Sequence, residues 1–185
     1  KADAKHVTST IFNGKPLIAY SDSKSGILKI AIWDGKSWKR TTVDGAGGTA
    51  GRTKSAITSP ISLCVNGSGV KQTLHLFYSE SDDRDLHYAT YDGKKFTYEI
   101  VDGNGVQVND YKDPVRVRTG SDVSVSNACV ATTGGIQVFY RDESQGILLG
   151  ATKVKGSSKW SYELVDGDRK TDGRSTGDVA FHLKA

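Results

Sequence analysis

Arginine recurs at three matching places in this 185-residue chain, where it opens short, similar stretches. Arg118 and Arg174 begin RTGSDV and RSTGDV, and Arg52 begins the looser match RTKSAI. A guanidinium group binds a carboxylate or another anion through two parallel hydrogen bonds. Three arginines that converge could therefore hold an anionic ligand. Arginines at equivalent positions of a repeat could also tie one loop to the next, and we favour this structural role.

Aromatic side chains could provide stacking platforms for sugar rings, because their faces are large and apolar while Trp and Tyr also carry a polar group. The candidates are Trp33, Trp38, Tyr91, Phe96, Trp160 and Tyr162. The segment 104–121 is a long connection that contains Tyr111 and Arg116. Binding residues concentrate on loops that a rigid scaffold positions. We therefore add Tyr111 and Arg116 to the candidate ligand-binding residues.

Catalytic and metal-binding patterns are not found. The acidic segments 82–85 and 166–172 lack the Asp-x-Asp-x-Asp-Gly spacing of a calcium loop, and the four histidines have no metal-like spacing. No nucleophile can be assigned together with a general acid or base. We therefore predict no catalytic residues, no metal and no cofactor, and the sequence leans against an enzyme without deciding the question.

The two cysteines, Cys64 and Cys129, fall in the similar segments SLCV and NACV. A disulfide requires Cα atoms within about 7 Å, and equivalent positions of neighbouring repeats tend to lie farther apart. A free cysteine is commonly buried in a core as a small apolar residue. We therefore predict buried free thiols in preference to a bridge, with the bridge as the alternative.

These residues are carried by a repeat that occurs three times. Tyr20, Tyr78 and Tyr140 are each followed by an acidic residue two positions later, by Leu eight positions later and by Ala eleven positions later. Each copy ends in Val-Asp-Gly, and the third copy is two residues longer. Such self-similarity indicates a repeat architecture, in which one unit buries its faces only against its neighbours.

Each repeat shows strand signals and almost no helix signal. Runs such as LIAYS, LKIAIW and WKRTTV are rich in β-branched and aromatic residues and are bounded by Gly, Asp and Ser. Asp34-Gly35 and Asp92-Gly93 supply the positive φ angles of tight hairpin turns. With a further strand ahead of each copy, every unit has four antiparallel strands. This pattern predicts an all-β fold, a β-propeller of four-stranded blades.

We place the blades at residues 7–45, 57–103 and 122–167, with 178–185 as the first strand of a fourth blade, in one partial propeller domain. A propeller needs about four or more blades to close. We therefore expect the ring, of six or seven blades, to be completed by a second copy or by the missing remainder of a longer protein. The alternative is that the last strand joins the blade that begins at Val7.

The last three strands of each blade, represented in the first copy by IAYSDSKSGILKIAIWDGKSW, resemble the blades of the six-bladed fucose-binding lectins of fungi and bacteria. The resemblance implies a sugar clamp made of an Arg two residues before the Tyr and a Glu four residues before the Asp of Asp-Gly. This chain has Ile18, Leu76 and Val138 at the Arg position, and Ile30 and Tyr88 at the Glu position of the first two blades. The scaffold is therefore expected without fucose recognition at that site.

The repeated arginines also give the chain a weaker resemblance to sialidases, which are propellers with an arginine triad around a substrate carboxylate. The Asp-box of that family, Ser/Thr-x-Asp-x-Gly-x-Thr-Trp, is echoed at most by WDGKSW, YDGKKF and KGSSKW. No Tyr and Glu nucleophile pair can be assigned here.

Charge and hydropathy narrow the partners. The net charge is +4, with 25 Lys and Arg scattered among 21 Asp and Glu, so we predict no nucleic-acid groove. No apolar run approaches the roughly 18 residues of a membrane helix, so we predict no membrane insertion. We expect a secreted or cell-surface protein.

From these features we predict a non-catalytic, lectin-like recognition module that binds a glycan or a protein surface. One alternative is a fragment of a sialidase-like or glycosidase-like propeller enzyme, which requires Arg52, Arg118 and Arg174 to converge on one pocket. Another is a structural scaffold for protein–protein contacts, which would show a large apolar patch.

Overall fold

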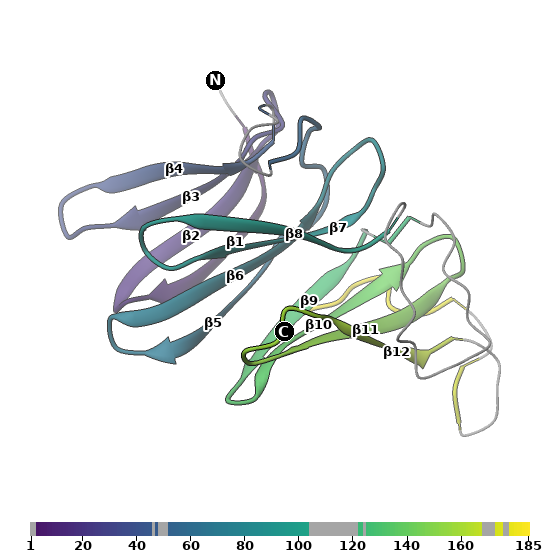
Figure 1. The fold of residues 1–185 in the computed structure, drawn as a ribbon. Coiled ribbons are helices and arrows are strands. Elements are labelled where there is room, and N and C mark those ends of the chain that lie inside the picture. Colours follow the sequence, from purple (N-terminus) through teal and green to yellow (C-terminus); the bar gives the residue numbers. More distant parts are fainter. Residues whose placement is uncertain are drawn as a thin grey trace.

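The computed structural model describes residues 3–45, 47, 52–103, 122–123, 125–167, 173–175 and 178–185. These residues contain twelve strands and no helix (Figure 1). The strands are β1 (Ala4–Phe12), β2 (Lys15–Asp22), β3 (Leu28–Trp33), β4 (Trp38–Asp44), β5 (Ser62–Ser68), β6 (Lys71–Ser79), β7 (Leu86–Tyr91), β8 (Phe96–Asp102), β9 (Asn127–Thr132), β10 (Gly135–Asp142), β11 (Ile147–Val154) and β12 (Ser161–Asp166). Four strands fall within each of the three repeats.

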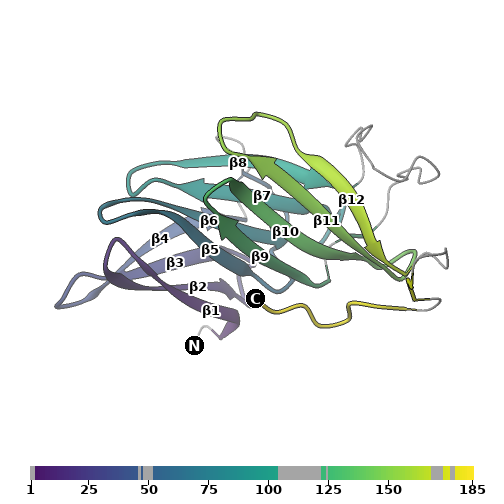
Figure 2. The same ribbon diagram turned by 90° about the horizontal axis from the view of Figure 1, so that it is seen from below.

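The strands form three antiparallel sheets of four, each in sequential order. We call them blade one (β1–β4), blade two (β5–β8) and blade three (β9–β12). The first strands of the blades, β1, β5 and β9, lie next to one another (Figure 2). The all-β class and the four-stranded blades predicted from the repeat are confirmed.

Two hydrophobic cores fill the junctions between the blades. One contains Leu17, Ile30 and Val43 of blade one with Leu76 and Tyr78 of blade two. The other holds the opposite face of blade two against blade three. Successive residues of a strand point to opposite faces of the sheet, so a central blade needs apolar residues on both. In β6, the six residues from Leu74 to Ser79 are all buried for this reason.

The segment that leaves each blade docks on the turn between the second and third strands of that blade. The Ile57 N–H donates to the Gly26 carbonyl at 2.8 Å, and the Val123 N–H donates to the Arg84 carbonyl at 3.3 Å. The Val179 N–H donates to the Gly146 carbonyl at 3.1 Å in the same way. Residues 178–179 therefore leave blade three as the two internal connections leave their blades.

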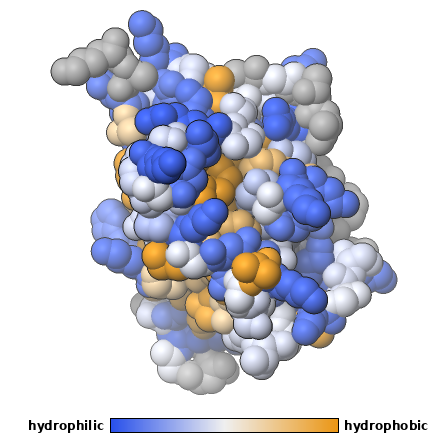
Figure 3. All heavy atoms as spheres, turned by 90° about the vertical axis from the view of Figure 1, so that its left-hand side faces the viewer, coloured by the Kyte–Doolittle hydropathy of each residue, from blue (hydrophilic) through white to orange (hydrophobic). Residues whose placement is uncertain are grey.

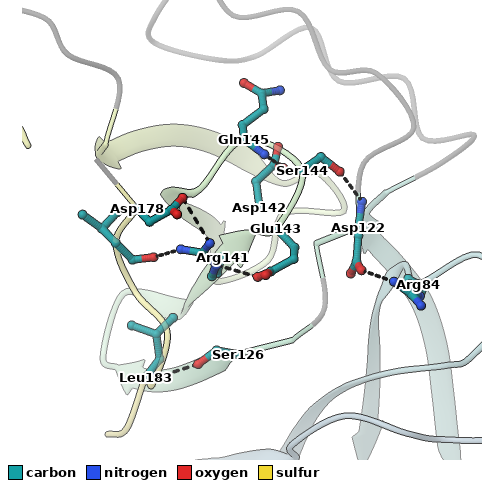
Figure 4. A network of polar contacts seen from close by, with 11 residues as sticks. Arg84, Asp122, Ser126, Arg141, Asp142, Glu143, Ser144, Gln145, Asp178 and Leu183 are labelled. Atoms are coloured by element: carbon teal, nitrogen blue, oxygen red, sulfur yellow. Dashed lines mark hydrogen bonds and ion pairs between the residues drawn. The ribbon is translucent and has the colours of Figure 1, made fainter. Parts of the chain in front are cut away.

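Residues 178–185 form no strand, so the first strand of a fourth blade stays a prediction. They are held by Arg141, whose guanidinium donates to the Val179 carbonyl and lies 3.4 Å from Asp178 Oδ1 (Figure 4). The Leu183 N–H donates to Ser126 Oγ at 2.7 Å. Arg141 itself is almost fully buried.

A disulfide joins Cys64 of β5 to Cys129 of β9, with the Cα atoms 5.7 Å apart. The prediction of buried free thiols is therefore wrong. Cys64 pairs with His75, three residues before Tyr78, whereas Cys129 pairs with Val138, two residues before Tyr140. The cysteines thus differ by one step of register, which turns them to opposite faces of their blades and toward each other.

A tyrosine and an aspartate lock each junction. The Tyr78 hydroxyl of blade two donates to Asp44 Oδ2 of blade one at 2.5 Å, and the Tyr140 hydroxyl of blade three donates to Asp102 Oδ2 of blade two. All four residues are fully buried. The repeated Tyr and the Asp of Val-Asp-Gly are therefore hydrogen-bond partners across each blade boundary.

Candidate functional site

Trp33 and Trp38 lie side by side at the hairpin that joins β3 to β4. They are cross-strand partners, and their rings are 5.6 Å apart at an angle of 54°. The turn between them is held by Asp34, whose Oδ1 accepts the N–H groups of Lys36 and Ser37 at 2.8 Å each. Gly35 supplies the positive φ of 100° that this turn requires. The two indoles are half-buried, so part of each ring faces solvent.

Charged groups border this tryptophan pair. The Arg40 guanidinium is exposed and lies 3.4 Å from the Trp38 carbonyl. Hydrogen bonds from the Ser37 and Lys36 amides hold the pKa of Asp34 at about 2, so this carboxylate is ionised at neutral pH. An apolar ring surface beside an ionised carboxylate and a guanidinium can stack on a sugar ring and bond its hydroxyls.

The hairpin ends of blades one and two lie together at the left of Figure 1. Figure 3 shows this side of the molecule, where hydrophobic residues form separate areas among hydrophilic ones. Such a surface offers apolar contact and polar rims in alternation. It is not one large apolar patch of the kind that a structural scaffold would show.

In blade two the corresponding aromatic pair is Tyr91 and Phe96, whose rings stack at 4.4 Å. Phe12 of blade one lies 5.8 Å from the Tyr91 ring. The Tyr91 hydroxyl donates to the Gly93 carbonyl at 2.9 Å. This pair is therefore already covered in part by its neighbouring blade.

In blade three Trp160 is buried in the junction with blade two. Its Nε1–H donates to Glu99 Oε2 at 3.0 Å, and its ring meets the Tyr88 ring edge-on at 5.2 Å. Lys153 Nζ lies 2.5 Å from Glu99 Oε1 and 5.5 Å from the Trp160 ring. Trp160 therefore packs a junction, whereas Trp33 and Trp38 keep free ring surface.

The positions of the lectin-type clamp are apolar and packed. Leu76, Val138 and Ile30 are fully buried in the junctions, and Ile18 is half-buried. Tyr88, at the Glu position of blade two, donates to or accepts from His75 Nδ1 at 2.6 Å. These side chains cannot reproduce an Arg and Glu clamp.

Arg52 fastens the connection between blades one and two. Its Nη2 donates to the Thr42 carbonyl at 3.3 Å, and its Nε donates to the Tyr98 hydroxyl at 3.1 Å. Tyr98 in turn donates to the Val43 carbonyl at 2.8 Å. These contacts are those of a structural arginine.

Arg174 follows Asp166 of blade three at the spacing at which Arg52 follows Asp44 of blade one. Hydrogen bonds from Ser175 and Gly167 lower the pKa of Asp166, and the positive charge of Arg174 adds to this effect. The two arginines therefore belong to the ends of different blades. Arg118, Arg116 and Tyr111 lie outside the described residues, so their roles stay predictions.

A pocket of about 330 Å³ beside Arg52 has polar walls that include Glu80 and His87. Glu80 accepts the N–H groups of Asp82, Asp83 and Arg84 at 2.7, 2.9 and 2.8 Å and so organises the β6–β7 turn. Burial lowers the pKa of His87, which stacks on Tyr78. Arg52, Glu80 and His87 thus all have structural contacts.

Among the described residues, no group of three or more His, Cys, Asp or Glu side chains is arranged to hold a metal ion. Over the same part of the chain, no helix is long and apolar enough to cross a membrane.

No protein-family model and no curated protein matches this chain. Its structure is similar to that of the fucose-specific lectin from Aleuria aurantia, with a TM-score of 0.55 and 18% identity over 86% of this chain and 44% of the lectin. The fold is that of a β-propeller. A variant of the same lectin in complex with alpha-methyl-L-fucoside gives the same values. The propeller blades of this chain therefore span less than half of the lectin's length.

The sialidase NanB from Streptococcus pneumoniae is also similar, with a TM-score of 0.46 and 14% identity over 83% of this chain and 22% of the sialidase. The blade resemblance expected from the repeat is confirmed at the level of the fold by the lectin.

Proposed function

We propose that this chain is a non-catalytic, lectin-like recognition module that binds a glycan through Trp33 and Trp38. The observation that carries the proposal is the half-exposed tryptophan pair, set 5.6 Å apart on a rigid hairpin and bordered by Arg40 and Asp34. Trp160, which matches Trp38 in blade three, is buried against blade two, but Trp33 and Trp38 are only half-buried and keep ring surface for a ligand.

The ligand differs from one held by an Arg and Glu clamp, because those positions are apolar here. The similarity to a fucose-specific lectin supports the choice of a glycan over a protein surface, since it offers the same scaffold for the task. The positive net charge and Arg40 favour acidic glycans.

We place the protein outside the cell or at its surface. The disulfide between Cys64 and Cys129 supports this location, because disulfides form and persist in oxidising compartments. Glycans of cell surfaces are found in the same place.

A glycan array with purified protein tests the function, followed by calorimetry with each bound sugar. Trp38→Ala and Trp33→Ala should each weaken binding roughly tenfold or more, as is typical for a central aromatic contact. Phe181→Ala is the matched control, because Phe181 is 53% exposed and lies on the C-terminal segment. No binding by the wild-type protein, or equal binding by the tryptophan variants, would contradict the proposal.

A further inference from the structure

Blade one and blade three each have one face without a neighbouring blade, and each of these free faces carries one partner of the Tyr–Asp hydrogen bond that joins the blades. Tyr20 of blade one occupies the position of Tyr78 and Tyr140, and Asp166 of blade three occupies that of Asp44 and Asp102. Tyr20 is half-buried, and its hydroxyl has no hydrogen-bond partner within the described part of the chain. The tyrosine half of the lock is thus at one end and the aspartate half at the other.

Asp166 accepts the same kind of backbone hydrogen bonds as Asp44. Oδ1 of Asp44 accepts the N–H groups of Gly45 and Thr53 at 2.7 Å each. Oδ1 of Asp166 accepts those of Gly167 and Ser175 at 2.7 and 2.5 Å. Oδ2 of Asp166 also accepts the Ser175 hydroxyl at 3.0 Å and, with two lone pairs, can accept a tyrosine hydroxyl as well.

The free face of blade three is apolar at the positions that, in blade two, pack against blade three. On blade two, Phe77, Leu86 and Val101 are fully buried against blade three. Their counterparts on blade three are Phe139, Leu148 and Val165, of which Val165 is 36% exposed and the other two are half-buried. This face has the composition of a blade junction without the second blade.

The free face of blade one is its complement. Ile18 is half-buried, whereas its counterparts Leu76 and Val138 are fully buried in the two junctions. Ile11, on the same face of β1, is 57% exposed. Removing these aliphatic side chains from water would stabilise a contact in proportion to the area covered.

We propose that a second copy of this chain docks its blade one on blade three, and receives the first copy's blade one on its own blade three. Tyr20 of each copy then donates to Asp166 of the other, and the two contacts are identical under a two-fold axis. Two copies of three blades give a ring of six. Propellers typically have four to eight blades, so one copy is too few and three copies are too many.

Closure of the ring requires β1 of the second copy to replace the C-terminal segment beside β9. The Asp3 carbonyl accepts the Ser23 N–H at 2.9 Å, just as the Ala56 and Asp122 carbonyls accept the N–H groups of Ser81 and Glu143. Blade one therefore already carries its own first strand, β1. In the ring, β1 of the second copy lies beside β9, and residues 180–185 give up the hydrogen bond from Leu183 to Ser126.

Closure also completes the proposed glycan site, and this step rests on the proposed function. In β12, Glu163 pairs with Gly150 as Glu99 pairs with Tyr88 in blade two. Because Trp160 donates to Glu99, the equivalent Trp38 would face Glu163 of the second copy. Gly150 has no ring like that of Tyr88, and a Cβ placed on it would lie 3.2 Å from Glu163 Cγ and 3.5 Å from Phe139 Cε1. Glu163 Oε1 accepts a hydrogen bond from Gln137 Nε2 at 3.2 Å, so a sugar stacked on Trp38 would meet this Glu163 and Phe139 surface.

Light scattering over a concentration series tests the ring with the full chain. The expected mass is twice 19.9 kDa at high concentration. Ile18→Arg and Leu148→Arg each spoil one end of the arc, so both should abolish the dimer, while Val70→Arg on the exposed β5–β6 turn should leave it intact. Tyr20→Phe, which keeps the ring contact, should raise the dissociation constant about tenfold.

A wild-type protein of single-chain mass at every concentration would overturn the proposal. So would a mass that grows without limit, or a dimer that only one of the two Arg variants disrupts, because a face that pairs with itself needs only one end. Circular dichroism confirms that each variant folds. The mass does not depend on sugar binding, so a dimer that binds no glycan would contradict the proposed function and leave the proposed ring standing.

Discussion

The Tyr78 hydroxyl donates to Asp44 Oδ2 at 2.5 Å and so joins the middle of blade two to the end of blade one. Burial and the neighbouring Asp44 carboxylate raise the pKa of Tyr78 well above its ordinary value of 10. The phenol therefore keeps its proton and remains a donor over the whole working pH range. Asp44 is buried with it and also accepts hydrogen bonds from the Gly45 and Thr53 amides.

We expect Tyr78→Phe to lower the free energy of unfolding by about 2 kcal/mol, because it removes a hydrogen bond to a buried charge while keeping the ring. Urea unfolding at one fixed protein concentration measures the change.

Tyr91→Phe is the matched control for this variant. The Tyr91 hydroxyl donates to the Gly93 carbonyl on an exposed turn, and its loss should cost less than about 0.5 kcal/mol. Equal effects of the two substitutions would show that the tyrosine does not lock the junction.

The disulfide should hold blades two and three together. It closes a loop with a sequence separation of 65, for which the chain-entropy estimate is about 4 kcal/mol. We expect Cys64→Ala combined with Cys129→Ala to lower the free energy of unfolding by about 2 to 4 kcal/mol. Reductant should destabilise the wild-type protein similarly and should not affect the double variant. A wild-type protein that is insensitive to reductant would mean that no bridge forms.

The repeat in the sequence was sufficient to predict the strands, because apolar and β-branched runs between Gly and Asp turns recur at fixed spacing. It was not sufficient to predict contacts across blades. The pairing of Cys64 with Cys129 depends on a single step of register, which spacing from Tyr78 and Tyr140 reveals only once the strand partners are known.

The Tyr and Asp of the lock could have been suspected from the sequence. Tyr20 and Asp44 recur in all three copies, and a polar group repeated on apolar strands implies a buried partner. What the sequence could not show is that the partner belongs to the neighbouring blade. The burial of Trp160 was likewise hidden, because Glu99, its hydrogen-bond acceptor, has the small polar residue Thr41 as its counterpart in blade one.

His75 should make the stability pH-dependent. Burial and the nearby Lys153 charge lower the pKa of His75 to about 4, whereas the unfolded chain has the ordinary value of 6.5. Between these values the unfolded state binds more protons, so stability is complete above pH 6.5 and is lost as the pH falls toward 4. The loss from this residue should reach about 3 kcal/mol.

The measurement is urea unfolding of the wild-type protein and of His75→Gln at several pH values from 7.5 to 4. Burial also lowers the pKa values of His6 and His87, so both proteins should lose stability in acid. The difference between them isolates His75 and should shrink as the pH falls. Parallel profiles would mean that His75 titrates normally in the folded state.

The connection from blade one to blade two passes over Gly26, which lies in the turn between β2 and β3. Only glycine allows this close approach. A Cβ placed on Gly26 would lie 2.3 Å from the Ala56 Cβ, and the φ of +68° is strained for any other residue. Gly14 has a similar φ of +73° on an open turn, with nothing within 4 Å of an added Cβ. Gly14→Ala therefore measures the backbone strain alone, about 1 kcal/mol.

Gly26→Ala should cost about 3 kcal/mol, because the connection must also move away and weaken the bond from Ile57 to Gly26. Urea unfolding of both variants gives the difference, which is the contribution of the docked connection. Equal losses would mean that this connection can shift freely, and the similar docking of Val179 on Gly146 would then hold the C-terminal segment no more firmly.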